Sequence, residues 1–239
     1  MTSLEVPARD RIVRAAATLL VEGGREAVTT RAVARAAGVQ APTIYRQFGD
    51  MRGLLDAAAS YHLATYLDAQ AARPPADDPV DDLRRGWDMQ VEFGSTHPAV
   101  HGLMYGDPRP GPVPTAARVA RDILRHLVTR VAEAGRLRIE VDRATDLVHS
   151  ACCGVTLTLI RTPAGQRDPG LSTLTREAVV RSVATDTVAA RAPRRVDRPV
   201  RHAVALRAVL PEVAADLTAA ERELLTEWLD RIVHAAPPP

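Results

Sequence analysis

The fold is decided by residues 29–51, which read TTRAVARAAGVQAPTIYRQFGDM. A helix-turn-helix needs a small residue where its two short helices cross, a residue that tolerates positive φ in the turn, and an aliphatic residue that locks the second helix. Ala34, Gly38 and Ile44 supply these at offsets of four and six residues. The spacing therefore predicts a helix-turn-helix, although a plain helical corner with a solvated polar face would show the same spacing.

The second of these helices has two chemically different faces. We expect it to begin at Pro42, because proline favours the first turn of a helix. Ile44 and Phe48 share its buried side, since successive helical residues lie about 100° apart. The opposite side and the leading end carry Gln40, Ala41, Pro42, Thr43 and Arg46. An exposed polar face of this kind is what a recognition helix offers to the major groove of DNA.

Helical periodicity continues on both sides of the motif. Apolar residues recur at helical spacing over residues 12–20, and Gly23 with Gly24 is expected to end that helix. After the motif, Asp50 caps a longer helix that runs towards Ala71. The motif is therefore embedded between an amphipathic helix and a capped long helix, which strengthens the helix-turn-helix interpretation.

The rest of the chain reads as helices separated by loops rich in proline and glycine. The expected helices cover residues 79–94, 98–105, 116–134, 142–161 and 172–190, followed by a connector over 191–199 and two further helices. Aromatic residues make up only 3% of the chain, so small aliphatic side chains must fill the core. That composition favours close-packed helices over a sheet sandwich, and the predicted fold class is all-α.

Charge is informative only where it is unevenly distributed. All 31 basic residues are arginine, and a net charge of +2 is too small to indicate nucleic acid by itself. The first 52 residues, however, carry eight arginines against five acidic residues. This moderate excess predicts that two such segments act together to bind DNA with useful affinity.

The sequence shows no sign of export or membrane insertion. Residues 1–10 contain no apolar secretory core. The uncharged apolar stretch over 151–160 is far shorter than the ~20 residues of a membrane helix. The adjacent Cys152 and Cys153 form neither a disulfide framework nor a metal-binding spacing. We therefore expect a cytoplasmic location without membrane contact.

Residues 8–60 resemble the TetR family of one-component repressors, whose signature is a threonine-capped helix, an Ala-Gly-Val turn and Tyr-x-x-Phe. The matching positions are Ala36-Ala37-Gly38-Val39, Thr43-Ile44-Tyr45, Phe48 and Asp50. The resemblance implies a three-helix DNA-binding head over residues 1–55, joined to a larger helical ligand-binding and dimerisation domain over residues 56–190. A helical extension over residues 191–239 lies outside the core family plan.

The resemblance also implies roles for single residues. Thr30 matches a position that caps the second helix and meets phosphate, and Arg31 matches one that reads guanine in some members. Tyr45 matches the tyrosine whose hydroxyl commonly holds a phosphate. Met51 stands where the family usually has lysine, so the neighbouring Arg52 is a candidate replacement. The full predicted DNA-binding set is Thr30, Arg31, Gln40, Ala41, Pro42, Thr43, Tyr45, Arg46, Gln47 and Arg52.

After residue 75 the resemblance is to the general family plan, in which later helices form a ligand chamber and two of them pair with a second subunit. The rare large or polar side chains that are candidates for the chamber are Trp87, Gln90, Phe93, Met104, Tyr105, His126 and His149. The apolar side chains that are candidates for the dimer interface are Leu147, Ala151, Val155, Leu159, Val179 and Val183. The same apolar side chains are equally compatible with an ordinary internal core.

Three further features have alternative explanations. His97 and His101 have a zinc-chelating spacing, but Pro98 places His97 before its helix, and no metal site is predicted. The two cysteines are either a redox switch or, in an apolar helix, small core fillers. Six arginines over residues 191–207 form either a basic patch or a solvated connector.

The favoured function is a homodimeric, ligand-responsive transcriptional repressor, released from a palindromic operator by a small-molecule effector. The alternative is a DNA-bound regulator whose C-terminal domain contacts a protein partner and binds no small molecule. Neither a Gly-rich phosphate loop nor a nucleophile elbow, metal triad or convergent carboxylate pair is present in the sequence. An enzyme is therefore not expected, and no cofactor is assigned.

Overall fold

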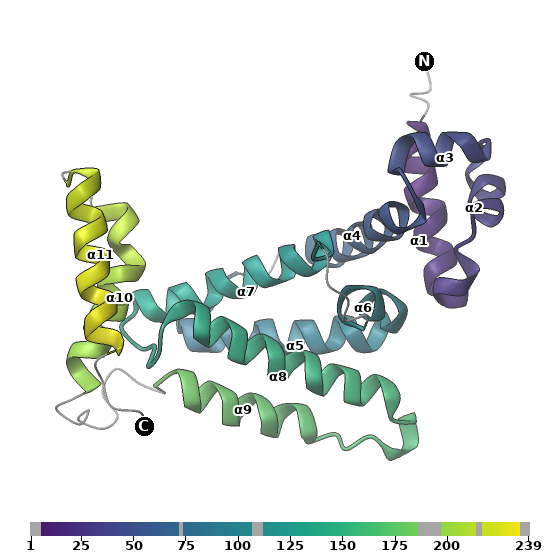
Figure 1. Cartoon of the computed structure of the whole chain (residues 1–239). Helices are drawn as coiled ribbons and strands as arrows, with labels where there is room; N and C mark the ends of the chain where they lie inside the picture. The colour runs from purple at the N-terminus through teal and green to yellow at the C-terminus, as the bar shows by residue number, and fades with distance from the viewer. Residues whose placement is uncertain (1–5, 72–73, 107–111, 186–196, 214–216, 235–239) are drawn as a thin grey trace. The chain divides into compact units, whose positions relative to one another are not determined.

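Helices make up almost all of the structure (Figure 1). The computed structural model describes residues 6–71, 74–106, 112–185, 197–213 and 217–234. Within those residues the backbone forms eleven α-helices, a 3-10 helix and one isolated antiparallel bridge between Leu137 and Ala184. The predicted all-α class is confirmed.

The helices follow the expected order along the chain. Their bounds are α1 Ala8–Ala27, α2 Thr30–Ala37, α3 Ala41–Phe48, α4 Met51–Gln70, α5 Pro79–Thr96, α6 Pro98–Tyr105, α7 Thr115–Glu133, α8 Val141–Arg161, η1 Ala164–Gln166, α9 Leu171–Val183, α10 Asp197–Val213 and α11 Ala219–His234.

One predicted helix end is confirmed and another was wrong. The helical backbone of α1 is interrupted at Gly24, which has φ 69° and ψ −169°, as the glycine pair predicted, and a short helical segment continues beyond it to Ala27. Helix α9 stops at Val183 because Ala184 is extended and pairs with the segment after α7. Two backbone hydrogen bonds hold that pairing, from the Arg138 N–H to Val183 O at 2.8 Å and from the Thr185 N–H to Arg136 O at 3.0 Å. Residues 186–190 lie outside the described residues.

Local caps explain several of the correctly predicted boundaries. The residue that caps α2 is Thr29, whose side chain accepts a hydrogen bond from the Ala32 N–H at 3.2 Å, and not Thr30, for which the resemblance implied this role. The Asp50 carboxylate accepts a hydrogen bond from the Gly53 N–H at 2.8 Å. These bonds satisfy amides that a helix N-terminus leaves without a partner. A capping box also precedes α11, where the hydroxyl and the backbone N–H of Thr218 both donate to the carboxylate of Glu221.

The chain divides into two compact units, each with its own core. Unit 1 comprises Met1–Pro74 with Glu92–Ala120, and unit 2 comprises Pro75–Val91 with Arg121–Pro239. Helices α5 and α7 thus contribute residues to both units. The predicted domain limits after residues 55 and 190 remain predictions.

Small side chains fill much of the core of unit 1. Ala16 and Ala17 of α1 and Ala58 and Ala59 of α4 are all buried, which allows these two helices to pack closely. The larger members of the same cluster come from α1, α2, α3, α4 and α6: Ile12, Leu20, Val33, Ile44, Leu54, Leu63 and Val100. Helices α1 to α4 therefore share one core, and this core holds α3 in a fixed orientation.

Unit 2 is built around Trp87 of α5. Its ring is 2% exposed, and its indole N–H donates to Ser172 Oγ of α9 at 3.1 Å. Aliphatic side chains of α5, α7, α8 and α9 surround it: Val80, Leu83, Val128, Val131, Val148 and Val180. The buried Arg136 pairs with Asp78, and this hydrogen bond holds the pKa of Asp78 below its usual value.

We expect Gly53→Ala to destabilise the protein and the matched variant Gly102→Ala to leave it as stable or more so. A Cβ at Gly53 would lie 2.2 Å from the carbonyl oxygen of Phe48, whereas one at Gly102 would meet nothing within 4 Å. Overpacking costs about 1–3 kcal/mol, while alanine is about 1 kcal/mol better than glycine inside a helix. Urea unfolding measures both effects, and equal midpoints for the two variants would contradict the predicted clash.

Candidate nucleic-acid interface

Helices α2 and α3 form the predicted helix-turn-helix. Gly38 ends α2 in the left-handed region at φ 64° and ψ 41°, where a side chain would be strained. The N–H of Val39 donates to Ala34 O at 3.0 Å and closes the turn. Val33 and Ile44 are 0% exposed and lie in the same core cluster. The three positions recognised by their spacing therefore occupy the places that a helix-turn-helix requires.

The opposite face of α3 is open to solvent. Helix α3 begins at Ala41, one residue earlier than predicted, with Pro42 in its first turn. Seven of the ten predicted DNA-binding residues are exposed: Arg31, Gln40, Pro42, Tyr45, Arg46, Gln47 and Arg52. The other three are partly buried: Thr30, Ala41 and Thr43. Since none of the ten is buried, all of them are accessible to an external partner, and their roles remain predictions.

The cations beside this face have no internal partners. Across the residues that the structure describes, no carboxylate pairs with Arg31, Arg46 or Arg52. The N-cap residue Gln40 makes no capping bond with its side chain, Pro42 has no N–H, and the Thr43 N–H already donates to Gln40 O at 2.9 Å. The guanidinium groups therefore supply the positive charge and the hydrogen-bond donors available to an anionic ligand.

A short hydrogen-bonded chain joins the beginnings of α2 and α4 to α3. The hydroxyls of Thr30 and Tyr45 lie 3.0 Å apart, and the Thr30 hydroxyl donates to the sulfur of Met51 at 3.3 Å. Because each hydroxyl has one proton, this arrangement makes Tyr45 the donor to Thr30. A thioether is a weak acceptor, so the chain can reverse and free the Tyr45 proton for a phosphate oxygen.

Two arginines of α1 support this region and were missed in the sequence. Arg11 Nε donates to Ala37 O, the last carbonyl of α2, at 3.2 Å. The guanidinium of Arg9 lies 5.2 Å from the centre of the Phe48 ring, at the end of α3. No local pattern predicts contacts between residues so far apart in the chain.

The candidate chamber residues are divided between the two units. Phe93 and Met104 are buried in the core of unit 1, and the Tyr105 ring lies 4.9 Å from the ring of His101. Trp87, in unit 2, is core, Gln90 and His149 are partly buried, and His126 is exposed. Their assignment to one ligand chamber remains a prediction.

The candidate dimer residues lie mostly against the core of unit 2. Val155 and Val183 are buried within it, and the partly buried members that pack against it are Ala151, Leu159 and Val179. Leu147 is the exposed member at 42%. Leu174 of α9 was not among the interface residues predicted from the sequence, and its side chain is 69% exposed. Leu147 and Leu174 are therefore the large apolar side chains that α8 and α9 leave exposed within the described residues, and the dimer interface remains a prediction.

The cysteines and histidines show no arrangement for redox or metal chemistry in the described residues. Burial raises the pKa of Cys152 and raises that of Cys153 to about 12, which disfavours the reactive thiolate. His97 is the N-cap of α6, as Pro98 predicted. No group of three or more histidine, cysteine or acidic side chains is placed to hold a metal within those same residues.

Two further sequence features concern the membrane and the C-terminal arginines. Among the helices described, none has both the length and the apolar character needed to cross a bilayer. Of the arginines over residues 191–207, those at 191–196 lie outside the described residues. Arg207 of α10 forms an ion pair with Asp230 of α11 and thus joins the two last helices.

The helix-turn-helix region matches a known family. The family model described as bacterial regulatory proteins, tetR family, covers residues 12–58. Residues 12–58 of this chain are thus similar to the DNA-binding segment of TetR-family regulators. The match includes most of α1, the whole of α2 and α3, and the start of α4, so the resemblance inferred from the signature residues is confirmed.

Two curated relatives are similar to part of this chain. An uncharacterized HTH-type transcriptional regulator of Mycobacterium bovis is 42% identical over 57 residues, which are 24% of this chain and 30% of that protein. The tetracycline repressor protein class C of Escherichia coli is 45% identical over 78 residues, which are 33% of this chain and 35% of that protein. The chain thus spans about a third of the length of the curated relatives it matches.

The likeness in fold extends further than the likeness in sequence. A solved structure of a protein with unknown function from Rhodococcus sp. RHA1 has a TM-score of 0.62 at 19% identity. The alignment covers 77% of this chain and 100% of that chain. The two proteins share an overall fold, and nearly a quarter of this chain has no counterpart in the other.

We expect the stability of unit 2 to fall as the pH drops below 6.5, with His149 as one cause. Burial first, and then the charge of Arg121, lower the pKa of His149 from its usual 6.5. The unfolded chain therefore binds this proton more tightly than the folded chain, so stability present above pH 6.5 is lost below it.

Urea unfolding above and below pH 6.5 measures this effect. His149→Phe should reduce the loss of stability on acidification, whereas His126→Phe, at an exposed position of α7, is the matched control. A pH dependence that is the same in wild type and His149→Phe would rule out a contribution from this imidazole.

Proposed function

We propose that this chain is a DNA-binding transcriptional regulator whose helix α3 enters the major groove. The observation that carries the proposal is the solvent-exposed polar face of α3, which lies opposite the fully buried Ile44. Three arginines at this face pair with no carboxylate among the described residues. Recognition helices present such a face, with residues of the first turn at the base edges. The TetR-family match over the same residues supports this use of the helix.

The side chains divide into those suited to phosphates and those suited to bases. Thr30 and Tyr45 are hydroxyl donors at the edge of α3 and fit phosphate oxygens, which fix register but carry no sequence information. Arg31 and Arg46 have the planar fork that binds guanine O6 and N7 in pairs. We assign positioning to the hydroxyls and base reading to these arginines.

We further propose that two chains bind a palindromic operator. The moderate positive charge of one head favours two heads per complex, with half-sites about one helical turn, ~34 Å, or somewhat more apart. Leu147 of α8 and Leu174 of α9 are exposed apolar side chains, which a second copy would remove from water. Their exposure supports pairing of α8 and α9 with the same helices of a second chain.

We propose that the regulator is a cytoplasmic repressor released by a small-molecule effector. One relative is named a tetracycline repressor, and the family plan places an effector in the C-terminal helices. A coupling of about 1–3 kcal/mol between effector and operator would suffice to change occupancy. Because coupling is reciprocal, operator DNA should weaken effector binding by the same factor.

A second candidate is a DNA-bound regulator whose C-terminal part contacts a protein. Leu224, Trp228 and Ile232 are spaced four residues apart on α11 and are 44%, 51% and 44% exposed. An apolar stripe of this kind suits a partner helix. A small molecule that changes operator affinity would favour the first candidate. A screen that finds no such molecule, together with a protein partner that binds through α11, would favour the second.

We expect Arg46→Ala to weaken specific DNA binding by about 1–3 kcal/mol and to relax preference at one base pair. Arg31→Ala should have the same kind of effect at a different base pair. The operator is identified as the DNA flanking the gene that the bound protein protects. Selection of binding sequences from a randomised operator then measures the preference at each base pair. Arg222→Ala, an exposed arginine of α11, is the matched control. Unchanged preference in both Arg46→Ala and Arg31→Ala would refute the groove assignment.

We expect Leu174→Glu to shift the protein from dimer to monomer, because a carboxylate would be buried at the interface of the two chains. Ile123→Glu on α7, where the parent side chain is 39% exposed, should leave the dimer intact. Sedimentation velocity at several protein concentrations measures the equilibrium. A wild type that is monomeric throughout, or a Leu174→Glu variant that dimerises as tightly as wild type, would refute pairing through α9.

A further inference from the structure

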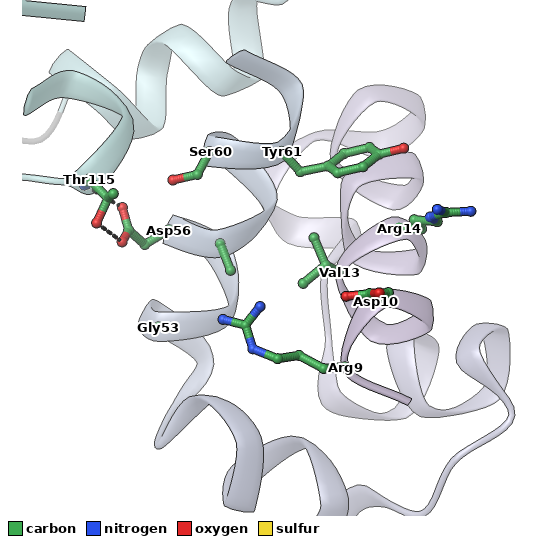
Figure 2. Close-up of a pocket in the computed structure, with 10 residues that line it drawn as sticks. Arg9, Asp10, Val13, Arg14, Gly53, Asp56, Ser60, Tyr61 and Thr115 are labelled. Atoms are coloured by element: carbon green, nitrogen blue, oxygen red, sulfur yellow. Dashed lines mark hydrogen bonds between the residues drawn. The ribbon is translucent and has the colours of Figure 1, made fainter. Parts of the chain in front are cut away.

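A cavity of about 490 Å³ lies within unit 1, between α1, α4 and the first residue of α7 (Figure 2). This volume is in the range of small-molecule sites. The residues that line it are Arg9, Asp10, Val13, Arg14, Gly53, Asp56, Ala57, Ser60, Tyr61 and Thr115. None of them belongs to the candidate chamber residues, so the cavity is a separate candidate site.

The charged groups of the cavity are not equivalent. Figure 2 shows the Arg9 side chain reaching from α1 towards α4, whereas Arg14 points away from α4. No carboxylate pairs with Arg9 in the described part of the chain. Asp56, in contrast, accepts hydrogen bonds from the N–H and the hydroxyl of Thr115, both at 2.7 Å. Arg9 is therefore the cation available to a ligand inside the cavity.

The remaining lining is apolar with few polar groups. Val13, Ala57 and the ring of Tyr61 supply apolar surface between the two helices. Ser60 Oγ is buried and has no hydrogen-bond partner among the described residues, so it is an unused polar atom in the same wall. Asp10, in the first turn of α1, disfavours ligands with more than one negative charge.

We propose that this cavity binds a small monocarboxylate with an apolar body, its carboxylate paired with Arg9. One guanidinium matches one carboxylate in charge and in planar geometry. The apolar body then covers Val13 and Ala57. The Arg9 guanidinium also lies against the Phe48 ring of α3, so the ligand and the end of the candidate recognition helix compete for the same cation.

The probe for this site is 2-naphthoate, whose fluorescence reports its binding directly without DNA. The isosteric amide 2-naphthamide keeps the apolar body but lacks the charge. We expect naphthoate to bind with one-to-one stoichiometry at this site and the amide to bind at least tenfold more weakly. This test does not rest on the proposed function, because it requires no operator.

Variants of the cavity locate the probe. Arg9→Gln should weaken naphthoate at least tenfold, and Ala57→Leu should weaken it by filling the space between α1 and α4. Arg14→Gln removes the same charge from the same helix and should change the affinity by less than about twofold, since its side chain points away. Thermal unfolding confirms that each variant is folded.

The competition for Arg9 has a reciprocal test. Phe48→Leu removes the ring that faces the guanidinium, so naphthoate binding should tighten by about two- to fivefold. Absence of naphthoate binding up to about 1 mM, or equal affinity in wild type, Arg9→Gln and Ala57→Leu, would overturn the site. Equal affinity in wild type and Phe48→Leu would overturn the shared use of Arg9.

Discussion

The burial of Ile44 is the constraint on which the candidate interface depends. Its side chain is fully enclosed by the core that α3 shares with α1, α2 and α4. Once Ile44 points inwards, the helical period fixes Pro42, Thr43 and Arg46 on the outside. The left-handed turn at Gly38 sets the direction from which α3 reaches that core. The interface is therefore a consequence of packing, with no need for bonds that hold each polar side chain in place.

The parts of this region that were predicted from the sequence are those set by residues close together in the chain. Asp50 caps α4 through an amide three residues away, and Gly38 tolerates a backbone that other residues avoid. Contacts such as Arg9 with Phe48 and Arg11 with Ala37 depend on the fold itself. The same distinction explains why α9 was predicted too long, since its end is fixed by pairing with the distant Leu137.

Unit 2 was less predictable because apolar periodicity does not say what covers a helix face. Val155 and Val183 have the same character as Leu147 and Leu174, yet the first two are core and the last two are exposed. A sequence records that each side chain prefers to leave water. Only the packing of α8 and α9 shows which of these four side chains are already buried within one chain.

Magnitudes limit what the cavity at Arg9 can do to the interface. A cation–π contact at an exposed site contributes about 0.5–1 kcal/mol. Moving a two-state equilibrium from 1:99 to 99:1 takes about 5.5 kcal/mol of differential binding. Loss of the Arg9–Phe48 contact alone would therefore adjust the orientation of α3 rather than switch it. A complete switch would need several kcal/mol of further differential binding, so a ligand at the proposed carboxylate site would act as a modulator of α3.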